Sequence, residues 1–179
     1  MPKIIYHVAS SLDGFIADKD GKVDWLNEFD GFADDEVLKD FQDFMNSFGA
    51  ILVGGHTYDF TLDYGQWMSP GFPTWVFTQR NLKILDPCIQ LTTETPLKIC
   101  GDLKQRGIER AWLMGGGKLA ASFQDEGLID EIYLAIIPIF LGQGIPLLGK
   151  TKQEPKLTLM DSKSYSNGMV SVNYKVHSA

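Results

Sequence analysis

The stretch that decides the fold is AWLMGGGKLAASFQDEG, residues 111–127. An apolar segment typical of a buried strand, Ala111 to Met114, runs into three glycines and then into a segment typical of a helix. Glycine is costly to order, so three in a row require a reason. Free backbone N–H groups at a helix start, together with the helix dipole, make an anion site. The stretch alone leaves open whether the glycines hold a phosphate or serve a tight turn.

A second segment, ILVGGHTY at residues 51–58, has the same design. Its glycines would let a ligand approach the backbone closely, and Thr57 adds a hydroxyl group. In an open α/β sheet, ligands gather outside the carboxyl ends of the strands. Two such turns in one small domain therefore favour a phosphate-bearing ligand at that edge of the sheet.

Strand-like and helix-like segments alternate along the rest of the chain, which predicts an α/β fold with a mostly parallel, helix-covered central sheet. Asn167-Gly168 is a strong hairpin signal in the alternating tail, residues 156–177, so the sheet should end in a C-terminal antiparallel hairpin. Without repeats or linkers, residues 1–179 are expected to form a single domain. The expected strands cover residues 3–10, 50–55, 74–80, 88–93, 110–114 and 130–138, and the expected helices cover 34–48, 56–65, 97–106 and 118–127, with a long loop at 11–26.

The composition is that of an ordinary cytoplasmic protein. The 179 residues are 44% apolar and carry a net charge of −7, whereas a nucleic-acid-binding protein would more often be basic. With only two cysteines and no CxxC pair, neither a disulfide framework nor a zinc site is expected. The N-terminus is predicted to be a first strand, with no signal peptide. The longest apolar run, residues 132–141, is too short to span a membrane and contains Pro138.

Familiar nucleotide-binding motifs do not fit the glycine stretch. A P-loop would need glycine at Trp112 and Ser or Thr at Leu119. The Rossmann pattern would need its third glycine at Ala120, and the acidic residues about twenty positions on open the next strand. The chain also lacks GxSxG and HExxH, and its three histidines are dispersed, so no nucleophile or metal is expected. Hydride transfer from a bound cofactor fits this pattern.

Several motifs, in order and spacing, give the chain a specific resemblance. It resembles the dihydrofolate-reductase-like superfamily, with its three-layer fold, and most of all the C-terminal reductase domain of bacterial riboflavin biosynthesis and its stand-alone relatives. The resemblance covers nearly the whole chain and rests on ASSLDGFIA, VGGHTY, WVFTQR, LMGGGKLAASF and LIDEIYLAIIPIFLGQGIPLL.

The resemblance implies that NADPH lies across the carboxyl edge of the sheet. Backbone groups of Ala9 and Ile16 would hold the nicotinamide carboxamide. Arg80 and Lys118 would supply cations for the adenosine 2′-phosphate, or else be solvated turn charges. The resemblance further assigns Gly55, His56 and Thr57 to the pyrophosphate, Thr78, Gln79 and Arg80 to the 2′-phosphate, and Gly115, Gly116, Gly117, Lys118 and Leu119 to the remainder of the cofactor.

The half of the fold that would bind folate departs from dihydrofolate reductases. Gly55 stands where those enzymes usually carry a basic residue. Their pterin-binding acid falls near Leu38, with Asp34 and Asp40 close by, and Ala120 replaces an aromatic residue that often faces the nicotinamide. The cofactor half is therefore expected to be preserved better than the folate half.

Three residues are candidates for contact with the substrate. Asp13 could bind the substrate, or it could hold a loop by accepting hydrogen bonds from backbone N–H groups. Trp25 could close over a flat substrate or anchor its loop in the core. Phe41, with Phe44, could line the substrate cleft, although the helical spacing of both is typical of core residues.

These observations predict an NADPH-dependent oxidoreductase that reduces a pyrimidine- or pteridine-like small molecule. The nearest named activity is 5-amino-6-(5-phosphoribosylamino)uracil reductase of riboflavin biosynthesis. A true dihydrofolate reductase and a non-catalytic nucleotide-binding protein of the same fold are the alternatives. The apolar stretch 137–148 could bury a homodimer contact or fill the core.

Overall fold

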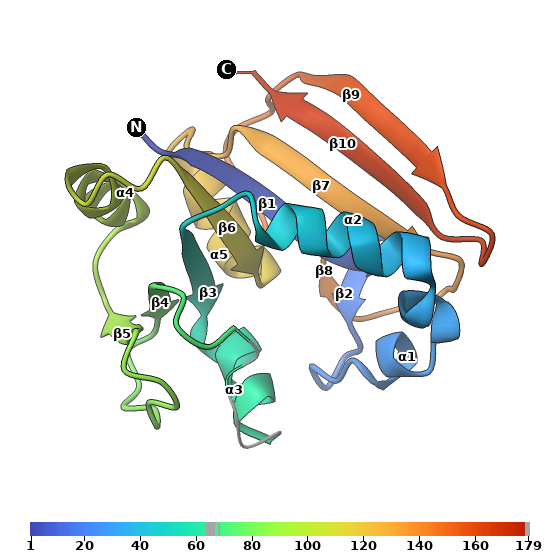
Figure 1. Ribbon diagram of the computed structural model, residues 1–179, viewed down its shortest axis with the longest axis horizontal. Helices are drawn as coiled ribbons and strands as arrows, with labels where there is room; N and C mark the ends of the chain where they lie inside the picture. The colour runs from blue at the N-terminus through green and yellow to red at the C-terminus, as the bar shows by residue number, and fades with distance from the viewer. Residues whose placement is uncertain (64–66, 68, 178–179) are drawn as a thin grey trace.

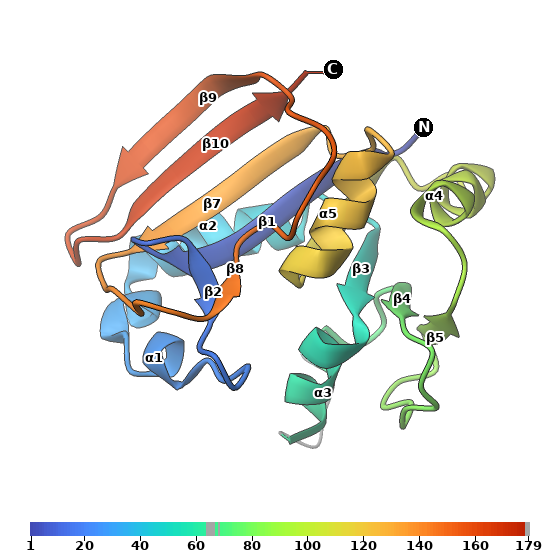
Figure 2. The same cartoon turned by 180° about the vertical axis from the view of Figure 1, so that it is seen from behind.

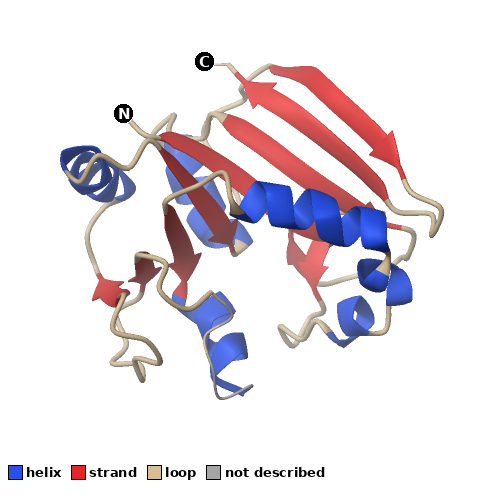
Figure 3. Cartoon of the chain, viewed as in Figure 1, coloured by secondary structure: helices blue, strands red, loops and turns tan. Residues whose placement is uncertain are grey.

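The computed structural model describes residues 1–63, 67 and 69–177. Helices cover both faces of a central sheet, as Figures 1 and 3 show. The helices are α1 (Asp24–Asn27), the 3-10 helix η1 (Asp30–Ala33), α2 (Asp35–Met45), α3 (Gly55–Asp63), α4 (Pro96–Gln105) and α5 (Gly117–Asp125). The strands are β1 (Lys3–Ser11), β2 (Phe15–Ala17), β3 (Ala50–Gly54), β4 (Thr74–Phe77), β5 (Ile89–Thr92), β6 (Arg110–Gly115), β7 (Glu131–Ile137), β8 (Ile145–Pro146), β9 (Leu157–Ser164) and β10 (Val170–Val176).

Eight of the ten described strands form one sheet in the order β5-β4-β3-β6-β1-β7-β10-β9, and β2 and β8 form a separate two-stranded sheet. Every neighbouring pair from β5 to β7 is parallel, whereas β10 runs antiparallel to both β7 and β9. Gly168 has a φ of +86° in the β9–β10 turn, a conformation that favours glycine. The predicted mostly parallel sheet with a C-terminal antiparallel hairpin is therefore confirmed.

Alternation along β1 separates two cores on opposite faces of the sheet. Ile4 and Tyr6 pack with residues of α4 and α5, and Figure 2, which shows the molecule from behind, has α5 in front of the sheet. Ile5 packs on the other face with Phe44 of α2 and Tyr58 of α3. This arrangement gives the expected three layers, and it places His7 and Ala9, which alternate with Val8, on the α2 side.

Several predicted boundaries differ from the structure, and two of the helices illustrate this. The helix expected at residues 34–48 begins after Asp34, whose carboxylate accepts hydrogen bonds from two backbone N–H groups, but it ends at Met45. The Ser47 hydroxyl donates to the Phe44 carbonyl at 2.7 Å, and Phe48 packs in the core beyond the helix end. In the second case, the helix expected at residues 56–65 begins one residue earlier, at Gly55, and the predicted residues Tyr64 and Gly65 lie outside the described residues.

The loop expected at residues 11–26 contains two short elements, β2 and the start of α1. Strand β2 pairs with β8, which comes from the apolar stretch 137–148. That stretch returns to the loop between β1 and β2, because Leu147 N–H donates to the Gly14 carbonyl at 2.9 Å. Leu147 and Leu148 pack against the core, whereas Phe140 is 72% exposed. The stretch thus fills part of the core and also leaves an aromatic side chain outside, so a homodimer stays a prediction.

Candidate active site

The two glycine turns predicted from the sequence meet in the structure. They follow β3 and β6, which are parallel neighbours, so both turns lie at the same edge of the sheet. A Cβ placed on Gly54 would lie 3.4 Å from the Gly115 carbonyl oxygen, and one on Gly116 would lie 3.3 Å from the Thr57 hydroxyl oxygen. The N-termini of α3 and α5 begin directly after these turns. Both helix starts therefore lie at one edge of the sheet, where their backbone N–H groups suit an anion.

The end of β4 brings a cation to the same edge. A Cβ on Gly55 would lie 2.8 Å from the Thr78 hydroxyl oxygen and 3.1 Å from Nη2 of Arg80. The guanidinium of Arg80 thus occupies the space over Gly55, where dihydrofolate reductases usually carry a basic residue. Arg80 also donates to the Asp59 carboxylate at 2.7 Å, and its side chain is 46% exposed. The Arg80 guanidinium and the Asp59 carboxylate can therefore both reach a ligand at this edge of the sheet.

The other predicted cofactor residues surround these turns. On β2, Ile16 places its Cδ1 atom 3.5 Å from the Cβ position of Gly116. Leu119 lies against Gly54, while His56, Gln79 and Lys118 are exposed. Gly117 differs from the rest, since its Cβ position would lie 2.3 Å from the carbonyl oxygen of Pro146. Stretch 137–148 packs so closely against Gly117 that this position has no room for a side chain. Packing is thus a reason for glycine here, in addition to its place in the predicted site.

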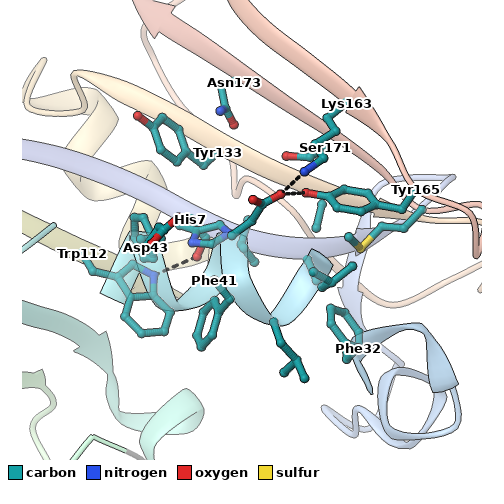
Figure 4. A pocket seen from close by; sticks show the side chains of 18 of the residues that line it. His7, Phe32, Phe41, Asp43, Trp112, Tyr133, Lys163, Tyr165, Ser171 and Asn173 are labelled. Atoms are coloured by element: carbon teal, nitrogen blue, oxygen red, sulfur yellow. Dashed lines mark hydrogen bonds and ion pairs between the residues drawn. The ribbon is translucent and has the colours of Figure 1, made fainter. Parts of the chain in front are cut away.

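A cavity of about 1140 Å³ lies between α2 and the sheet. Its walls come from β1, β6, β7, β10, β9 and the helices α1, η1 and α2, as Figure 4 shows for the labelled side chains. Ala9, one of the two residues expected to hold the nicotinamide carboxamide, is among the lining residues. The pocket therefore begins where the resemblance places the reactive end of the cofactor.

Aromatic rings form much of the inner wall. The His7 and Phe44 rings meet edge to face with centroids 4.2 Å apart, and the Phe44 and Trp112 centroids are 5.5 Å apart. Tyr133 lies 6.1 Å from His7, and Phe41 lies 6.0 Å from Trp112. Such a wall suits a flat ring, because aromatic groups gain both buried area and favourable ring contacts.

A charged cluster joins α2 to the hairpin at the pocket wall. Asp40 accepts hydrogen bonds from Lys163 and, at 2.7 Å, from the Tyr165 hydroxyl, and Lys163 also lies 2.9 Å from Glu36. The contact with Lys163, followed by that with Tyr165, lowers the pKa of Asp40. A carboxylate thus does reach the pocket near Leu38, but it is already paired with a cation. The sequence offered no local signal for Lys163 or Tyr165, which lie more than 120 positions from Asp40.

The three predicted substrate residues occupy different settings. Phe41 lines the pocket and is 42% exposed. Trp25 is 8% exposed and packs with Ile137 and Tyr165, so it anchors α1 in the core. Asp13 accepts hydrogen bonds from Leu141 N–H at 3.1 Å and Gly142 N–H at 2.7 Å. Its carboxylate therefore binds the backbone of the loop that follows β7.

His7 should titrate far below the ordinary range. Burial penalises the charged ring and lowers the pKa of His7 to about 4, from an ordinary value of 6.5. Between these values the unfolded chain binds more protons than the folded one. We therefore expect stability to fall as pH drops from about 6.5 to 4, by up to about 1.4 kcal/mol per pH unit from this residue. NMR shifts of the His7 ring measure the midpoint directly, and a midpoint near 6.5 would contradict its buried setting.

Neither a metal centre nor a membrane helix emerges from the described part of the chain. His, Cys, Asp and Glu side chains there do not gather in groups of three or more that could hold a metal ion. None of the helices there has the length and apolar character needed to cross a bilayer.

Comparison with known proteins agrees with this geometry. Residues 2–171 match the family described as the RibD C-terminal domain. Over 172 residues, 93% of this chain and 94% of the relative, the chain is 32% identical to "Uncharacterized protein YwjB" of Bacillus subtilis (strain 168). A "Putative riboflavin biosynthesis protein" from Shewanella sp. PV-4 matches with a TM-score of 0.81 and 26% identity, covering 99% of this chain and 100% of that one.

A more distant match shows the shared fold alone. The deaminase/5-amino-6-(5-phosphoribosylamino)uracil reductase of Thermotoga maritima has a TM-score of 0.71 and 20% identity, and it covers 98% of this chain and 57% of that longer one. These matches confirm the predicted dihydrofolate-reductase-like fold and the resemblance to the riboflavin-type reductase domain. Because the family match extends over nearly all of its length, the chain belongs to the RibD C-terminal domain family.

Proposed function

We propose that the protein is an NADPH-dependent reductase that transfers hydride to a planar pyrimidine- or pteridine-like substrate. One observation carries the proposal: the contacting glycine turns of β3 and β6 lie beside β1, whose residue Ala9 lines an aromatic pocket. A cofactor edge and a pocket for a flat ring thus adjoin on one side of the sheet. Membership of the RibD C-terminal domain family supports the same reaction.

Residues at the sheet edge fit NADPH by their chemistry. Backbone N–H groups at the starts of α3 and α5 suit the pyrophosphate, and Arg80 suits the 2′-phosphate, because guanidinium groups bind phosphate oxygens in pairs. When bound, NADPH supplies the hydride. The chain's own part is to orient the two rings and exclude water, which the aromatic wall around Phe41 and Trp112 can do.

The pocket favours a riboflavin-type pyrimidine over dihydrofolate. A dihydrofolate reductase needs a carboxylate free to bind the pterin, but Asp40 is engaged by both Lys163 and Tyr165. Removing these partners from Asp40 to bind a pterin would leave the Lys163 ammonium with Glu36 alone. The preferred activity is therefore reduction of 5-amino-6-(5-phosphoribosylamino)uracil or a related pyrimidine.

Steady-state oxidation of NADPH tests the proposal. The protein is mixed with NADPH and either 5-amino-6-(5-phosphoribosylamino)uracil, related pyrimidines or dihydrofolate. We expect NADPH consumption with a pyrimidine and little with dihydrofolate. Efficient turnover of dihydrofolate would favour the folate enzyme instead. Binding of NADPH without turnover of any of these compounds would favour a non-catalytic nucleotide-binding protein.

A further inference from the structure

Unpaired polar atoms gather in the pocket. Buried polar groups in proteins almost always have a hydrogen-bond partner, so each exception needs an explanation. Within the described residues, three of the buried side-chain atoms that lack a partner belong to residues lining this cavity, namely Nδ1 of His7, Nε of Arg110 and Oδ1 of Asn173. Their collection in one cavity indicates a missing polar ligand.

His7 and Asn173 lie in one row across the sheet. His7 on β1 stands opposite Tyr133 on β7, and Tyr133 stands opposite Asn173 on β10. Two strand spacings separate the backbones of His7 and Asn173 by about 10 Å. Figure 4 shows all three side chains on the sheet side of the pocket. A substituted heterocycle can span this row while lying next to Ala9, two residues along β1 from His7.

The unpaired groups of this row are uncharged. Burial lowers the pKa of His7 to about 4, so its ring is neutral in neutral solution. Asn173 carries no charge, and the nearby ammonium of Lys163 is already balanced by Asp40 and Glu36. His7 and Asn173 therefore match a ligand edge built from neutral donors and acceptors, such as the N–H and C=O groups of a uracil ring. The charged Arg110 lines the same cavity but does not belong to this pair.

We propose that His7 and Asn173 form a recognition pair for the polar edge of an uncharged planar heterocycle. Oδ1 of Asn173 accepts a hydrogen bond from a ring N–H or an amino group of the ligand. Nδ1 of His7 donates or accepts according to its tautomer. The inference rests on the proposed function, since this heterocycle is the substrate that would receive the hydride beside Ala9.

The test compares binding and stability in His7→Phe and Asn173→Leu, which replace each polar side chain by an apolar one of similar shape. Thr61→Val is the matched control, because the Thr61 hydroxyl is buried, lies outside the pocket and already donates to the Tyr58 carbonyl at 2.6 Å. Affinity for 5,6-diaminouracil is measured by tryptophan fluorescence, NADPH affinity by titration, and stability by thermal unfolding.

A role in ligand recognition and a purely structural role predict opposite changes in ligand affinity and in stability. A recognition pair means that each pocket variant binds 5,6-diaminouracil about five- to twentyfold more weakly, with unchanged NADPH affinity and an equal or higher Tm. The Thr61→Val control should lose stability and keep its affinity for the heterocycle. Pocket variants that lose stability yet bind 5,6-diaminouracil normally would overturn the inference, as would a wild type that binds NADPH but not this probe. Failure of the proposed function shows separately, as absence of NADPH binding and turnover.

Discussion

The Gly117→Ala protein should be about 3 kcal/mol less stable than the wild type. The new Cβ would lie 2.3 Å from the Pro146 carbonyl oxygen and 3.1 Å from that of Leu147. Both obstacles are backbone atoms, and the chain there is fixed by the hydrogen bond from Gly149 N–H to the Gly117 carbonyl at 2.9 Å. The stretch that returns from β8 must move away from α5 to admit a methyl group. Urea unfolding measures the loss.

Gly101→Ala is the matched control for this substitution. Gly101 lies inside α4, and no atom would lie within 4 Å of its added Cβ. Alanine should therefore stabilise that helix by about 0.5–1 kcal/mol. If Gly117→Ala were as stable as the wild type, stretch 137–148 would not be seated on the glycine turn as described.

Arg80→Ala should weaken NADPH binding about 10- to 100-fold while changing NADH binding less than about twofold. Only NADPH carries the 2′-phosphate, and hydrogen bonds between a guanidinium and a phosphate are among the stronger ones. Arg80 lies over Gly55, at the start of α3, with its guanidinium partly exposed. Titration of both cofactors into both proteins gives the ratio, and equal losses for the two cofactors would show that Arg80 does not bind the 2′-phosphate.

Asp59→Asn provides a companion to the Arg80 experiment. Asp59 holds Nη2 of Arg80 at 2.7 Å and places a negative charge where the 2′-phosphate would approach. Removing that charge should improve NADPH affinity by about two- to fivefold, the range expected for an exposed ion pair. A loss of affinity would mean that Asp59 positions Arg80 more than it competes with the phosphate.

The meeting of the two glycine turns, which we propose to hold the cofactor, could be predicted from the sequence because each turn is local. A strand, its glycines and the following helix are contiguous in the sequence. Each of the segments ILVGGHTY and WLMGGGKLAASF therefore predicts the turn that it contains. Parallel pairing of β3 with β6 then brings the turns together at one edge. The tail hairpin was predictable for the same reason, since Asn167-Gly168 lies inside it.

The pocket could not be predicted in this way because its parts are distant in the sequence. Asp40 meets Lys163 across a separation of 123 positions, and Asn173 reaches the row of His7 only through β7. The short strand β2 was missed because its partner, β8, follows about 130 residues later. The sequence left open whether Trp25 closes over a flat substrate or anchors its loop in the core. In the structure it packs in the core with Ile137.

Calorimetric titration of the wild-type protein with NADPH measures directly whether this edge of the sheet binds the cofactor. We expect one NADPH bound per chain, more tightly than NADH, because Arg80 and the starts of α3 and α5 lie at one edge of the sheet. Absence of binding at millimolar NADPH, or equal affinity for NADPH and NADH, would contradict it.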